Sequence, residues 1–516
     1  MLQHGQILRR RGLRVLGGPG AGWWLGGWLG ALGVKWLGLS VGGGVTLFGL
    51  GLLSAWLPAL LARQARPHWR WRQMFFCWLL LVLTGLIWLP LGWCGYLATL
   101  QAGVQLPAAF QNWLFNTRYD WLPIVVPVWG LTWLVSLKWL PSLAQQLHRP
   151  TNWRSYWRTG WHQSWWAVVK WLLMRLDILI ELVLLAGGLA LLTWLAESVR
   201  PRLGYVAAIL SLTVFQSWVG LMLAGGLTRR QPPTGLPRWR FWLNGVVCRS
   251  AMVSYGAWWL QPHNTVVPAI IAHRGVDGRD GVQNTTSALK RTVRRTHPAM
   301  VEMDIQPTAD RHWVVMHDPT LWALAQRPGP VKQYRLDQLA GLPLRENGQR
   351  GRLSTFAQYL TAANQLDQPL LVEIKALGGA GQLMGPFADR YAQTLINRRG
   401  AVHSLDYQVI VRLKQRNSRL QVGFITPFYL ADFSHSVADF YSLQGLTATR
   451  EQVNAAHRAQ RPVYFWTVDR PGDMQRLTAM GADGLITNHP GRLQRLQTLS
   501  NHYYFYQLIN WLFSWL

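Results

Sequence analysis

Seven ionisable side chains lie near the ends of short apolar runs in the second half of the 516-residue chain: His273, Arg274, Glu302, Asp304, His317, Glu373 and Lys375. Glu302 and Asp304 are two positions apart in the run MVEMDIQ, and Glu373 and Lys375 repeat this spacing in PLLVEIK. Alternate residues of a β-strand point to the same face of a sheet. If both runs are strands, each pair presents its two side chains to one side of the sheet.

The three carboxylates predict a site for a hard divalent cation. Carboxylates that share one pocket repel one another, and they stay ionised when a cation lies between them. Glu302, Asp304 and Glu373 offer only oxygen ligands, which suit Ca²⁺ or Mg²⁺ much better than Zn²⁺. We therefore expect Ca²⁺ or Mg²⁺ as the cofactor.

The remaining four side chains predict cleavage of a phosphodiester. Arg274 and Lys375 can neutralise a phosphate group beside the metal. His273 and His317 can act as a general base and a general acid, one deprotonating a nucleophile and the other protonating a leaving alkoxide. A bound metal would stabilise charge on the phosphoryl oxygens.

From Val266 onward, β-rich runs alternate with helical runs, as is typical of βα units. The predicted strands are 266–273, 300–306, 312–318, 369–375, 401–405, 420–426, 462–468 and 483–488. The predicted helices include 285–296, 354–366, 382–398, 407–416, 449–460 and 471–480. Eight strands with interleaved helices predict a TIM-type α/β barrel. The carboxyl ends of its strands share the rim at which active sites lie, so the seven side chains would converge there.

Two connections depart from a regular barrel. Only the five residues PTADR separate the second and third predicted strands, which is too short for a parallel crossover. We expect a hairpin-like excursion or a very short strand at this point. The span 319–368 is long for a loop and is expected to be a small helical insertion.

The first half of the chain has the composition of a membrane domain. Residues 1–261 contain four Asp and Glu against 18 in residues 262–516, and the net charges of the two parts are +19 and +10. The cations of the first part lie between apolar runs and beside Trp, which is typical of membrane-surface anchoring and argues against a nucleic-acid partner. Runs of the roughly 20 residues that cross a bilayer lie at 36–61, 74–99, 121–143, 171–195, 203–227 and 242–260, with 21–34 as a shorter seventh.

Loop charges predict a multi-pass protein of the cell membrane. The loops 62–73, 144–170 and 228–241 are basic and alternate with less basic loops. Because basic loops stay on the cytoplasmic side, the chain after residue 260 is predicted to lie outside the cell. The basic N-terminus is then inside only if 21–61, with its triple glycine at Gly42–Gly44, crosses twice or re-enters.

Two segments of the apolar part have a polar or aromatic character. Asp177 and Glu181 share a helical face near Arg175, where lipid is expected. They either form a polar track or headgroup site, or an arginine–carboxylate network that joins helices, and the network is favoured. Residues 499–516 are too short to span, and are interpreted as an interfacial aromatic anchor or as a packed end helix.

The motifs of the second half resemble those of the glycerophosphodiester phosphodiesterase family, in the subgroup with an N-terminal polytopic membrane domain. The resemblance rests on HRG (273–275), QNTTSAL (283–289), VEMDIQPTAD (301–310), VVMHD (314–318), VEIK (372–375), FWTVD (465–469) and ADGLITNHP (482–490). The domains would be a membrane domain of about six to seven helices (1–261), a barrel with its insertion (262–498, insertion 319–368) and the aromatic C-terminal segment (499–516).

The resemblance implies a TIM barrel of the phospholipase C-like phosphodiesterase type and hydrolysis of glycerophosphodiesters to glycerol 3-phosphate and an alcohol. It implies the following roles: metal binding by Glu302, Asp304 and Glu373, acid–base catalysis by His273 and His317, and phosphate contact by Arg274 and Lys375.

The sequence departs from the family's usual residues at two of these motifs, and Trp466 has two possible roles. The family's usual Glu-Asn-Thr appears as Gln283-Asn284-Thr285, and we expect Gln283 and Asn284 to lie behind the metal ligands. The usual Thr-Asp near the C-terminus appears as Thr487-Asn488. Trp466 at a strand end is expected to wall the pocket and pack a glycerol or choline-like group, or else to pack within the barrel.

A membrane location makes glycerophosphate polymers and lipid headgroups natural substrates, because tethering raises encounters with molecules anchored in the same membrane. Two other interpretations stay open. The barrel could be a phospholipase D-like lyase that acts on lysolipids and releases a cyclic phosphate. Alternatively, a catalytically degraded barrel could accompany a membrane domain that handles lipid or polymer around Asp177 and Glu181.

Overall fold

A computed structural model describes residues 3–16, 21–40, 48–49, 51–57, 70–88, 107–148, 152–227, 238–261, 267–375, 380–426, 433–446, 448–498 and 502–515. The chain divides into two compact units. One contains residues Met1–Val104, Arg118–Pro262 and His502–Leu516, and the other contains Gln105–Thr117 and His263–Asn501. Each unit has its own hydrophobic core.

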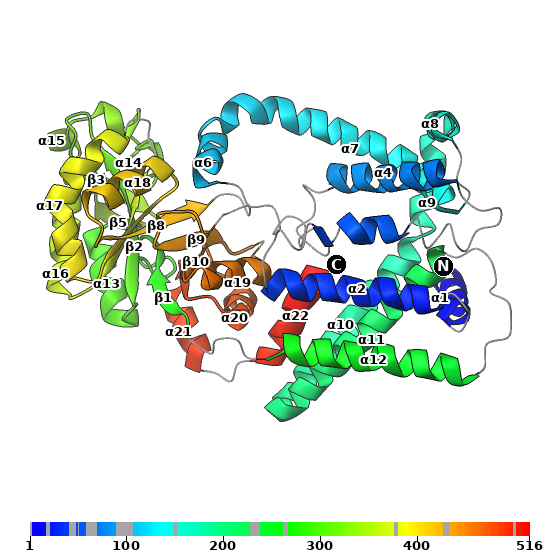
Figure 1. Ribbon diagram of the computed structural model, residues 1–516. Coiled ribbons are helices and arrows are strands. Elements are labelled where there is room, and N and C mark those ends of the chain that lie inside the picture. Colours follow the sequence, from blue (N-terminus) through cyan, green and yellow to red (C-terminus); the bar gives the residue numbers. More distant parts are fainter. Residues whose placement is uncertain are drawn as a thin grey trace. The chain divides into compact units, whose positions relative to one another are not determined.

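The first unit is helical (Figure 1). Its described helices include α1 (Gln3–Leu16), α2 (Ala21–Ser40), α4 (Trp71–Trp88), α7 (Arg118–His148), α8 (Trp153–His162), α9 (Trp165–Leu173), α10 (Leu176–Val199), α11 (Pro201–Leu227), α12 (Arg238–Trp259) and α22 (Tyr503–Trp515). Among the described residues, four stretches are long and apolar enough to cross a membrane: Trp71–Trp88, Arg118–Gln146, Trp165–Val199 and Pro201–Gly226. They coincide with four of the spans predicted from sequence.

Two of the other predicted spans lie in helices, and one is only partly described. The run 242–260 lies in α12, and the run 21–34 lies in α2. The run 36–61 is described only in part, and Gly42–Gly44 fall outside the described residues. The number of crossings before α4 therefore stays a prediction.

Charged side chains join the helices of this unit. Arg9 Nη2 of α1 lies 3.6 Å from Glu181 Oε1 of α10, and the Asp177 carboxylate accepts a hydrogen bond from the Ile178 amide at the start of α10. The ion pair between Arg9 and Glu181 is of the inter-helix arginine–carboxylate kind that the sequence favoured, and Arg175 interacts electrostatically with Asp177. Helix α1 also lies close against α11, because a Cβ added at Gly12 would collide with the backbone carbonyl oxygen of Leu221 in α11.

The aromatic C-terminal segment forms the packed helix α22. Trp511 is fully buried and meets Phe215 of α11 edge-on, with ring centroids 5.7 Å apart. The carboxylate of Glu197 accepts hydrogen bonds from the backbone amides of Tyr504 and Phe505 at 3.0 and 2.9 Å. This carboxylate satisfies amides that the first turn of a helix leaves unpaired. The observed contacts correspond to the packed end helix, the second of the two interpretations.

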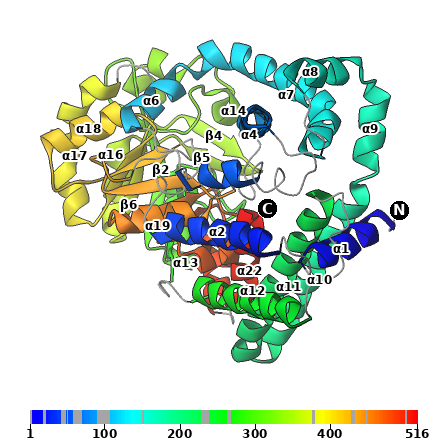
Figure 2. The same ribbon diagram turned by 45° about the vertical axis from the view of Figure 1, so that its right-hand side comes forward.

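The second unit is a closed barrel of eight parallel strands, which confirms the predicted fold class. The strands are β1 (Ala269–Ala272), β2 (Met300–Pro307), β6 (Leu370–Ile374), β7 (Ala401–Ser404), β8 (Gln421–Thr426), β9 (Phe440–Gln444), β10 (Val463–Trp466) and β11 (Gly484–Thr487). Each strand pairs with the next in this order, and pairing of β11 with β1 closes the barrel. Helices α13 (Thr286–Thr296), α16 (Phe356–Gln365), α17 (Met384–Asn397), α18 (Tyr407–Arg416), α19 (Arg450–Arg458), α20 (Pro471–Met480) and α21 (Pro490–Thr498) flank the strands (Figure 2).

One strand assignment made from sequence is wrong, and one barrel strand was not predicted. The run 312–318 is not a barrel strand, because β3 (Trp313–Val315) pairs antiparallel with β2 in the hairpin that the short connection predicted. The eighth barrel strand is β9, which pairs in parallel with β8 and β10 and was not predicted. Strand count was therefore right while one member of the set was misassigned.

The insertion after β3 contains a hairpin as well as the expected helices. Its elements are α14 (Trp322–Ala325), η3 (Val331–Gln333), α15 (Leu336–Leu339), β4 (Pro343–Glu346) and β5 (Gln349–Arg352). A small core that includes Leu321, Leu339 and Leu344 holds it together. The hairpin matters for the site, because its Glu346 reaches back to residues near the barrel rim.

A short helix from between two apolar helices packs on the barrel. Helix α6 (Ala108–Asn116) precedes α7 by one residue, yet it belongs to the barrel unit. The Tyr407 backbone amide, at the start of α18, donates a hydrogen bond to Asn112 Oδ1 at 2.8 Å. Gln111 and Asn112 are buried, whereas Phe110 and Trp113 are exposed and stacked.

Candidate active site

Strand register assembles the polar side chains at the carboxyl end of the barrel. Asp304 of β2 lies beside Glu373 of β6, and Glu373 lies beside His403 of β7. Glu302 precedes Asp304 by two residues and therefore points to the same face of β2. The three carboxylates that the sequence placed at this rim are thus close neighbours, together with a histidine that was not predicted there.

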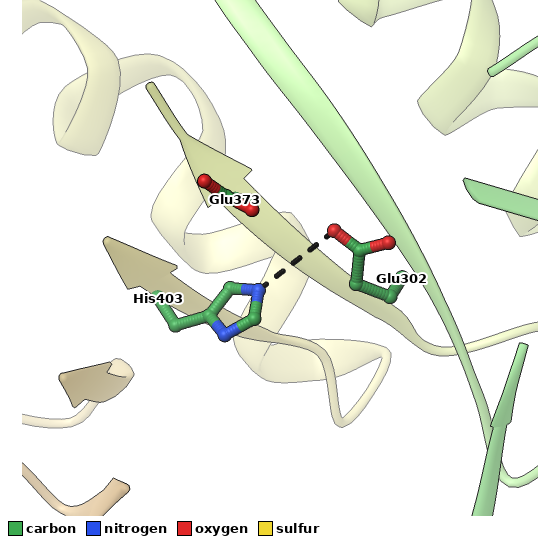
Figure 3. Close-up of side chains that lie close together, drawn as sticks. All are labelled: Glu302, Glu373 and His403. Carbon is green, nitrogen blue, oxygen red and sulfur yellow. Dashed lines mark ion pairs between the residues drawn. The ribbon is translucent and has the colours of Figure 1, made fainter. Parts of the chain in front are cut away.

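Glu302, Glu373 and His403 can each turn one ligand atom toward a common point (Figure 3). These three atoms lie within 4.8 Å of one another. Glu302 and His403 are buried, and buried carboxylates this close repel unless a cation lies between them. The donor set therefore fits a divalent metal ion held by Glu302 and Glu373, with Asp304 directly beside them in the sheet.

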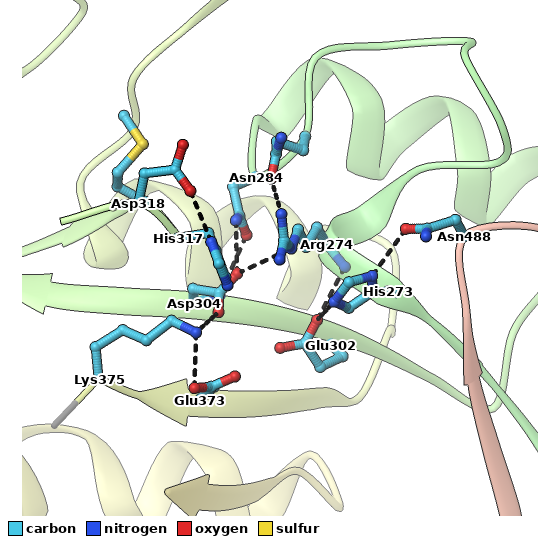
Figure 4. Close-up of polar contacts among 12 residues, drawn as sticks. His273, Arg274, Asn284, Glu302, Asp304, His317, Asp318, Glu373, Lys375 and Asn488 are labelled. Carbon is cyan, nitrogen blue, oxygen red and sulfur yellow. Dashed lines mark hydrogen bonds and ion pairs between the residues drawn. The ribbon is translucent and has the colours of Figure 1, made fainter. Parts of the chain in front are cut away.

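Asp304 faces cationic side chains (Figure 4). Lys375 Nζ lies 2.7 Å from Asp304 Oδ1 and 2.7 Å from Glu373 Oε1. Burial would raise the pKa of Asp304, but Lys375, His317 and Arg274 together hold it well below its usual range. Burial would lower the pKa of Lys375, but Asp304 and Glu373 raise it above its ordinary value. Both groups are therefore charged at neutral pH.

The His-Arg-Gly stretch makes a tight left-handed turn after β1. Arg274 has φ of 52° and Gly275 has φ of 67°, and a non-glycine residue in this region is strained and is often found at functional sites. The turn directs the Arg274 backbone amide to Glu302 Oε2 at 2.9 Å. It also places the guanidinium Nε 3.7 Å from Asp304 Oδ2. Arg274 therefore contacts the carboxylates through both its backbone and its side chain.

Gln283 and Asn284 support this turn from behind the carboxylates. Gln283 accepts a hydrogen bond from the Arg274 guanidinium and donates its own amide to Glu346 Oε1 at 2.6 Å. Asn284 donates to Asp304 Oδ2 at 2.8 Å. The carboxylate of Glu346, in the insertion, thus lies next to Gln283. The family's usual residue at this position is glutamate, which would itself carry a negative charge.

A relay of side chains orients His273. Its Nδ1 lies 2.8 Å from Asn488 Oδ1, and the Asn488 amide nitrogen donates to Asp469 Oδ2 at 2.8 Å. Because this donation fixes Oδ1 as the acceptor end of the amide, the His273 proton must be on Nδ1. The Nε2 atom is then the one that can accept a proton, and it lies 3.9 Å from Glu302 Oε2.

His317 is oriented in the same way from the opposite side of the site. Its Nδ1 lies 2.8 Å from Asp318 Oδ1, and its side chain is about one-third exposed. Gln306 donates its side-chain amide to the carbonyl oxygens of Met316, His317 and Asp318. These bonds hold the segment after β3 against β2, which keeps the second imidazole near the carboxylates.

Comparison with known proteins shows which family the barrel sequence is similar to. Residues 273–492 match the glycerophosphoryl diester phosphodiesterase family model. These residues form a glycerophosphoryl diester phosphodiesterase domain. A glycerophosphodiester phosphodiesterase of Caldanaerobacter subterraneus subsp. tengcongensis is 28% identical over 240 residues, which are 44% of this chain and 96% of that protein.

Two further comparisons cover a similar length. YhdW of Bacillus subtilis is 26% identical over 239 residues, which are 43% of this chain and 94% of that protein. The crystal structure of a glycerophosphodiester phosphodiesterase from Parabacteroides distasonis is 22% identical and covers 45% of this chain and 98% of that chain, with a TM-score of 0.39.

Trp466 lies at the end of β10 in the phosphodiesterase domain. Its indole nitrogen donates to the Ser442 carbonyl oxygen at 3.2 Å, and its side chain packs against a small apolar cluster inside the barrel. The residue is only partly buried. This contact agrees with the packing role, and the exposed part of the ring stays a prediction for substrate binding.

Several residues of the domain's site had no predicted role. The most important are His403, Ser442, Asp469, Asp318 and Glu346. Asp318 directly follows His317 and could have been found as the second half of a His-Asp pair. Asp469 ends the motif FWTVD, but no role was assigned to it, and its partner Asn488 lies 19 positions further on. His403, Ser442 and Glu346 lie far along the chain from their partners, and no local pattern connects them.

Proposed function

We propose that the barrel hydrolyses glycerophosphodiesters to glycerol 3-phosphate and an alcohol with the help of a divalent cation. The observation that carries this proposal is the pair of imidazoles, each held through Nδ1 by a polar partner, beside a cluster of carboxylates. This leaves two Nε2 atoms for proton exchange in a site that also contains an arginine and a lysine.

Each side chain has a distinct task in this reaction. Arg274 and Lys375 bind and orient the phosphate, as their charges and N–H donors allow. One of His273 and His317 accepts a proton from the water that attacks phosphorus, and the other gives a proton to the alkoxide that departs as the P–O bond breaks. Glu302, Asp304 and Glu373 would hold the metal ion, which would supply positive charge to stabilise the phosphoryl oxygens.

Release of glycerol 3-phosphate tests this proposal. The full chain in detergent is incubated with glycerophosphoglycerol, first with EDTA and then with added divalent ions. We expect release only with metal, and its loss in Glu302→Ala. The matched control is Asp483→Asn, at the amino-terminal end of β11, where the carboxylate pairs with His457. Equal release by Glu302→Ala and the control would contradict the assigned metal site.

The proposal extends to anchoring in the cell membrane with the catalytic domain outside. Four described stretches are apolar and long enough to cross, and the basic loops favour the cytoplasm. Helix α6 adds an independent constraint, because it packs on the barrel. Residues 107–117 and the barrel must then lie on one side of the membrane, which requires an even number of crossings between them.

Helix α12 makes that number even. Helices α7, α10 and α11 give three crossings, and we assign the fourth to α12 (Arg238–Trp259), which contains the predicted span 242–260 but is not among the four most apolar stretches. Its 22 residues span about 33 Å at 1.5 Å per residue, which is enough for the hydrocarbon core. This arrangement also places the basic segments near Arg158 and Arg238 together on the side away from the barrel, in agreement with the loop charges.

The membrane location favours substrates that are themselves held in the membrane. Exposed Phe110 and Trp113 lie on α6, one residue before the apolar helix α7, and aromatic side chains are enriched at membrane interfaces. Glycerophosphate polymers and lipid headgroups would meet the barrel at raised local concentration.

A further inference from the structure

His403 lies inside the candidate metal site although its sequence context gave no indication of this. It is on β7, directly beside Glu373 in the sheet register. Its Nε2 lies 3.9 Å from Glu302 Oε1, and its side chain is only 3% exposed. The ligand atoms of His403, Glu302 and Glu373 are all within 4.8 Å of one another.

The other ring nitrogen of His403 is held in place. Nδ1 lies 2.9 Å from Ser442 Oγ on β9, and both residues are buried. When the hydroxyl accepts from Nδ1–H, the lone pair of the ring is on Nε2. Metal-bound histidines characteristically use their second nitrogen in such an outer hydrogen bond.

Nε2 itself has no hydrogen-bond partner among the described residues. A protonated Nε2 would need an acceptor, but the nearest Glu302 oxygen at 3.9 Å is beyond hydrogen-bond distance. An unprotonated Nε2 would face two carboxylates with its lone pair. Either state leaves a buried polar atom unsatisfied, which is costly, and a cation between the three groups removes that cost.

We propose that His403 is a nitrogen ligand of the metal, and that the site therefore binds first-row transition-metal ions in preference to Ca²⁺. Imidazole suits ions such as Fe²⁺, Ni²⁺ and Zn²⁺, whereas Ca²⁺ takes oxygen ligands, and Mn²⁺ serves as the spectroscopic probe of the same ligands. This inference rests on the proposed metal-assisted phosphodiesterase reaction and names its cofactor class. It differs from the Ca²⁺ or Mg²⁺ that an all-oxygen set predicts.

The test detects a metal–nitrogen bond without using activity. Mn²⁺ is added to the full chain in detergent, and electron spin-echo spectroscopy measures coupling of the ion to histidine nitrogen. We expect coupling in the wild type and its loss in His403→Gln. His457→Gln is the matched control, because His457 is a second partly buried histidine that pairs with Asp483 outside the site.

Binding affinities give the second readout. His403→Gln should weaken Mn²⁺ binding by about tenfold or more, as loss of a ligand or its support typically does, and should change Ca²⁺ binding by less than about threefold. Ser442→Ala should weaken Mn²⁺ binding by a smaller factor while nitrogen coupling persists, because Ser442 only positions the ring.

His273 is the other imidazole near Glu302, so His273→Gln separates the two candidates. Coupling that persists in His273→Gln supports His403 even where His403→Gln fails to fold. Bound Mn²⁺ without nitrogen coupling in the wild type, or coupling that survives in folded His403→Gln, would overturn the inference. Metal-dependent release of glycerol 3-phosphate without nitrogen coupling refutes only this inference, whereas coupling without any release refutes only the proposed reaction.

Discussion

Lys375 neutralises the most deeply buried carboxylate of the site, and its removal has a predictable cost. Its Nζ is 2.7 Å from Asp304 Oδ1, and Asp304 is fully buried. Two unit charges about 4 Å apart interact by roughly 4 kcal/mol at an effective dielectric constant near 20, and breaking a buried pair costs about 3–5 kcal/mol. Lys375 is 15% exposed, and Arg274 stays 3.7 Å from Asp304. We therefore expect Lys375→Met to reduce stability by about 3 kcal/mol, at the lower end of that range.

Hydrogen exchange of the β2 and β6 amides measures this loss. A loss of about 3 kcal/mol corresponds to roughly a hundredfold faster exchange through opening of these strands. Lys414→Met is the matched control, because Lys414 pairs with Asp439 at 2.9 Å but that carboxylate is 19% exposed. The control should lose only about 1 kcal/mol. Lys375→Met combined with Asp304→Asn should recover stability, because no unpaired charge stays buried.

The effect has a defined pH dependence. The pKa of Asp304 in the folded protein lies below its unfolded value of about 3.9. Its contribution to stability is therefore complete above that pH and is lost as the pH falls. The difference between the wild type and Lys375→Met should be largest above about pH 4 and should narrow below it. A difference that is no larger than that of Lys414→Met, or that does not change with pH, would refute the reasoning.

The remaining predictions concern contacts far apart in sequence. Asn112→Ala should reduce local stability by about 1 kcal/mol, because the Tyr407 amide loses its hydrogen bond to the Asn112 side chain. Amide hydrogen exchange in the first turn of α18 should therefore become faster. Unchanged exchange would argue against docking of α6. Asp469→Asn should lower turnover by about 10–100-fold, because the Asn488 amide that orients His273 loses its carboxylate partner. The affinity for Mn²⁺ should stay unchanged. A kinetic assay with a parallel metal titration measures both quantities. Gly275→Ala should destabilise the barrel by about 1–3 kcal/mol in thermal unfolding, since alanine is strained at φ of 67°.

The fold could be predicted because βα alternation is a local property of the sequence. Most barrel strands are short apolar runs bounded by helical segments, and the sequence identifies them directly. Strand direction is not local, however. The run that contains β3 is as apolar as a barrel strand, and only the short PTADR connection indicated a hairpin. Strand β9, with the sequence FYSLQ, follows a segment that has no clear helical pattern. The alternation of strands and helices therefore did not indicate a strand there.

The seven site residues predicted from motifs lie together at one end of the barrel, and their roles stay predictions. The supporting residues could not be predicted, because their partners are distant in the chain. His273 and Asn488 are 215 positions apart, and His403 and Ser442 are 39 apart. A single histidine in a buried strand is usually structural, and only the register of β6 and β7 places His403 beside Glu373.

Product analysis by ³¹P NMR tests the central claim most directly. The full chain is incubated with glycerophosphoglycerol and Mn²⁺, beside His317→Ala. The account predicts conversion of the diester signal to the monoester signal of glycerol 3-phosphate in the wild type, and at least a hundredfold slower conversion in the variant, as for loss of a general acid or base. A cyclic phosphate as the final product would indicate a lyase, and an unchanged diester in the wild type, or equal rates in both proteins, would contradict catalysis by this site.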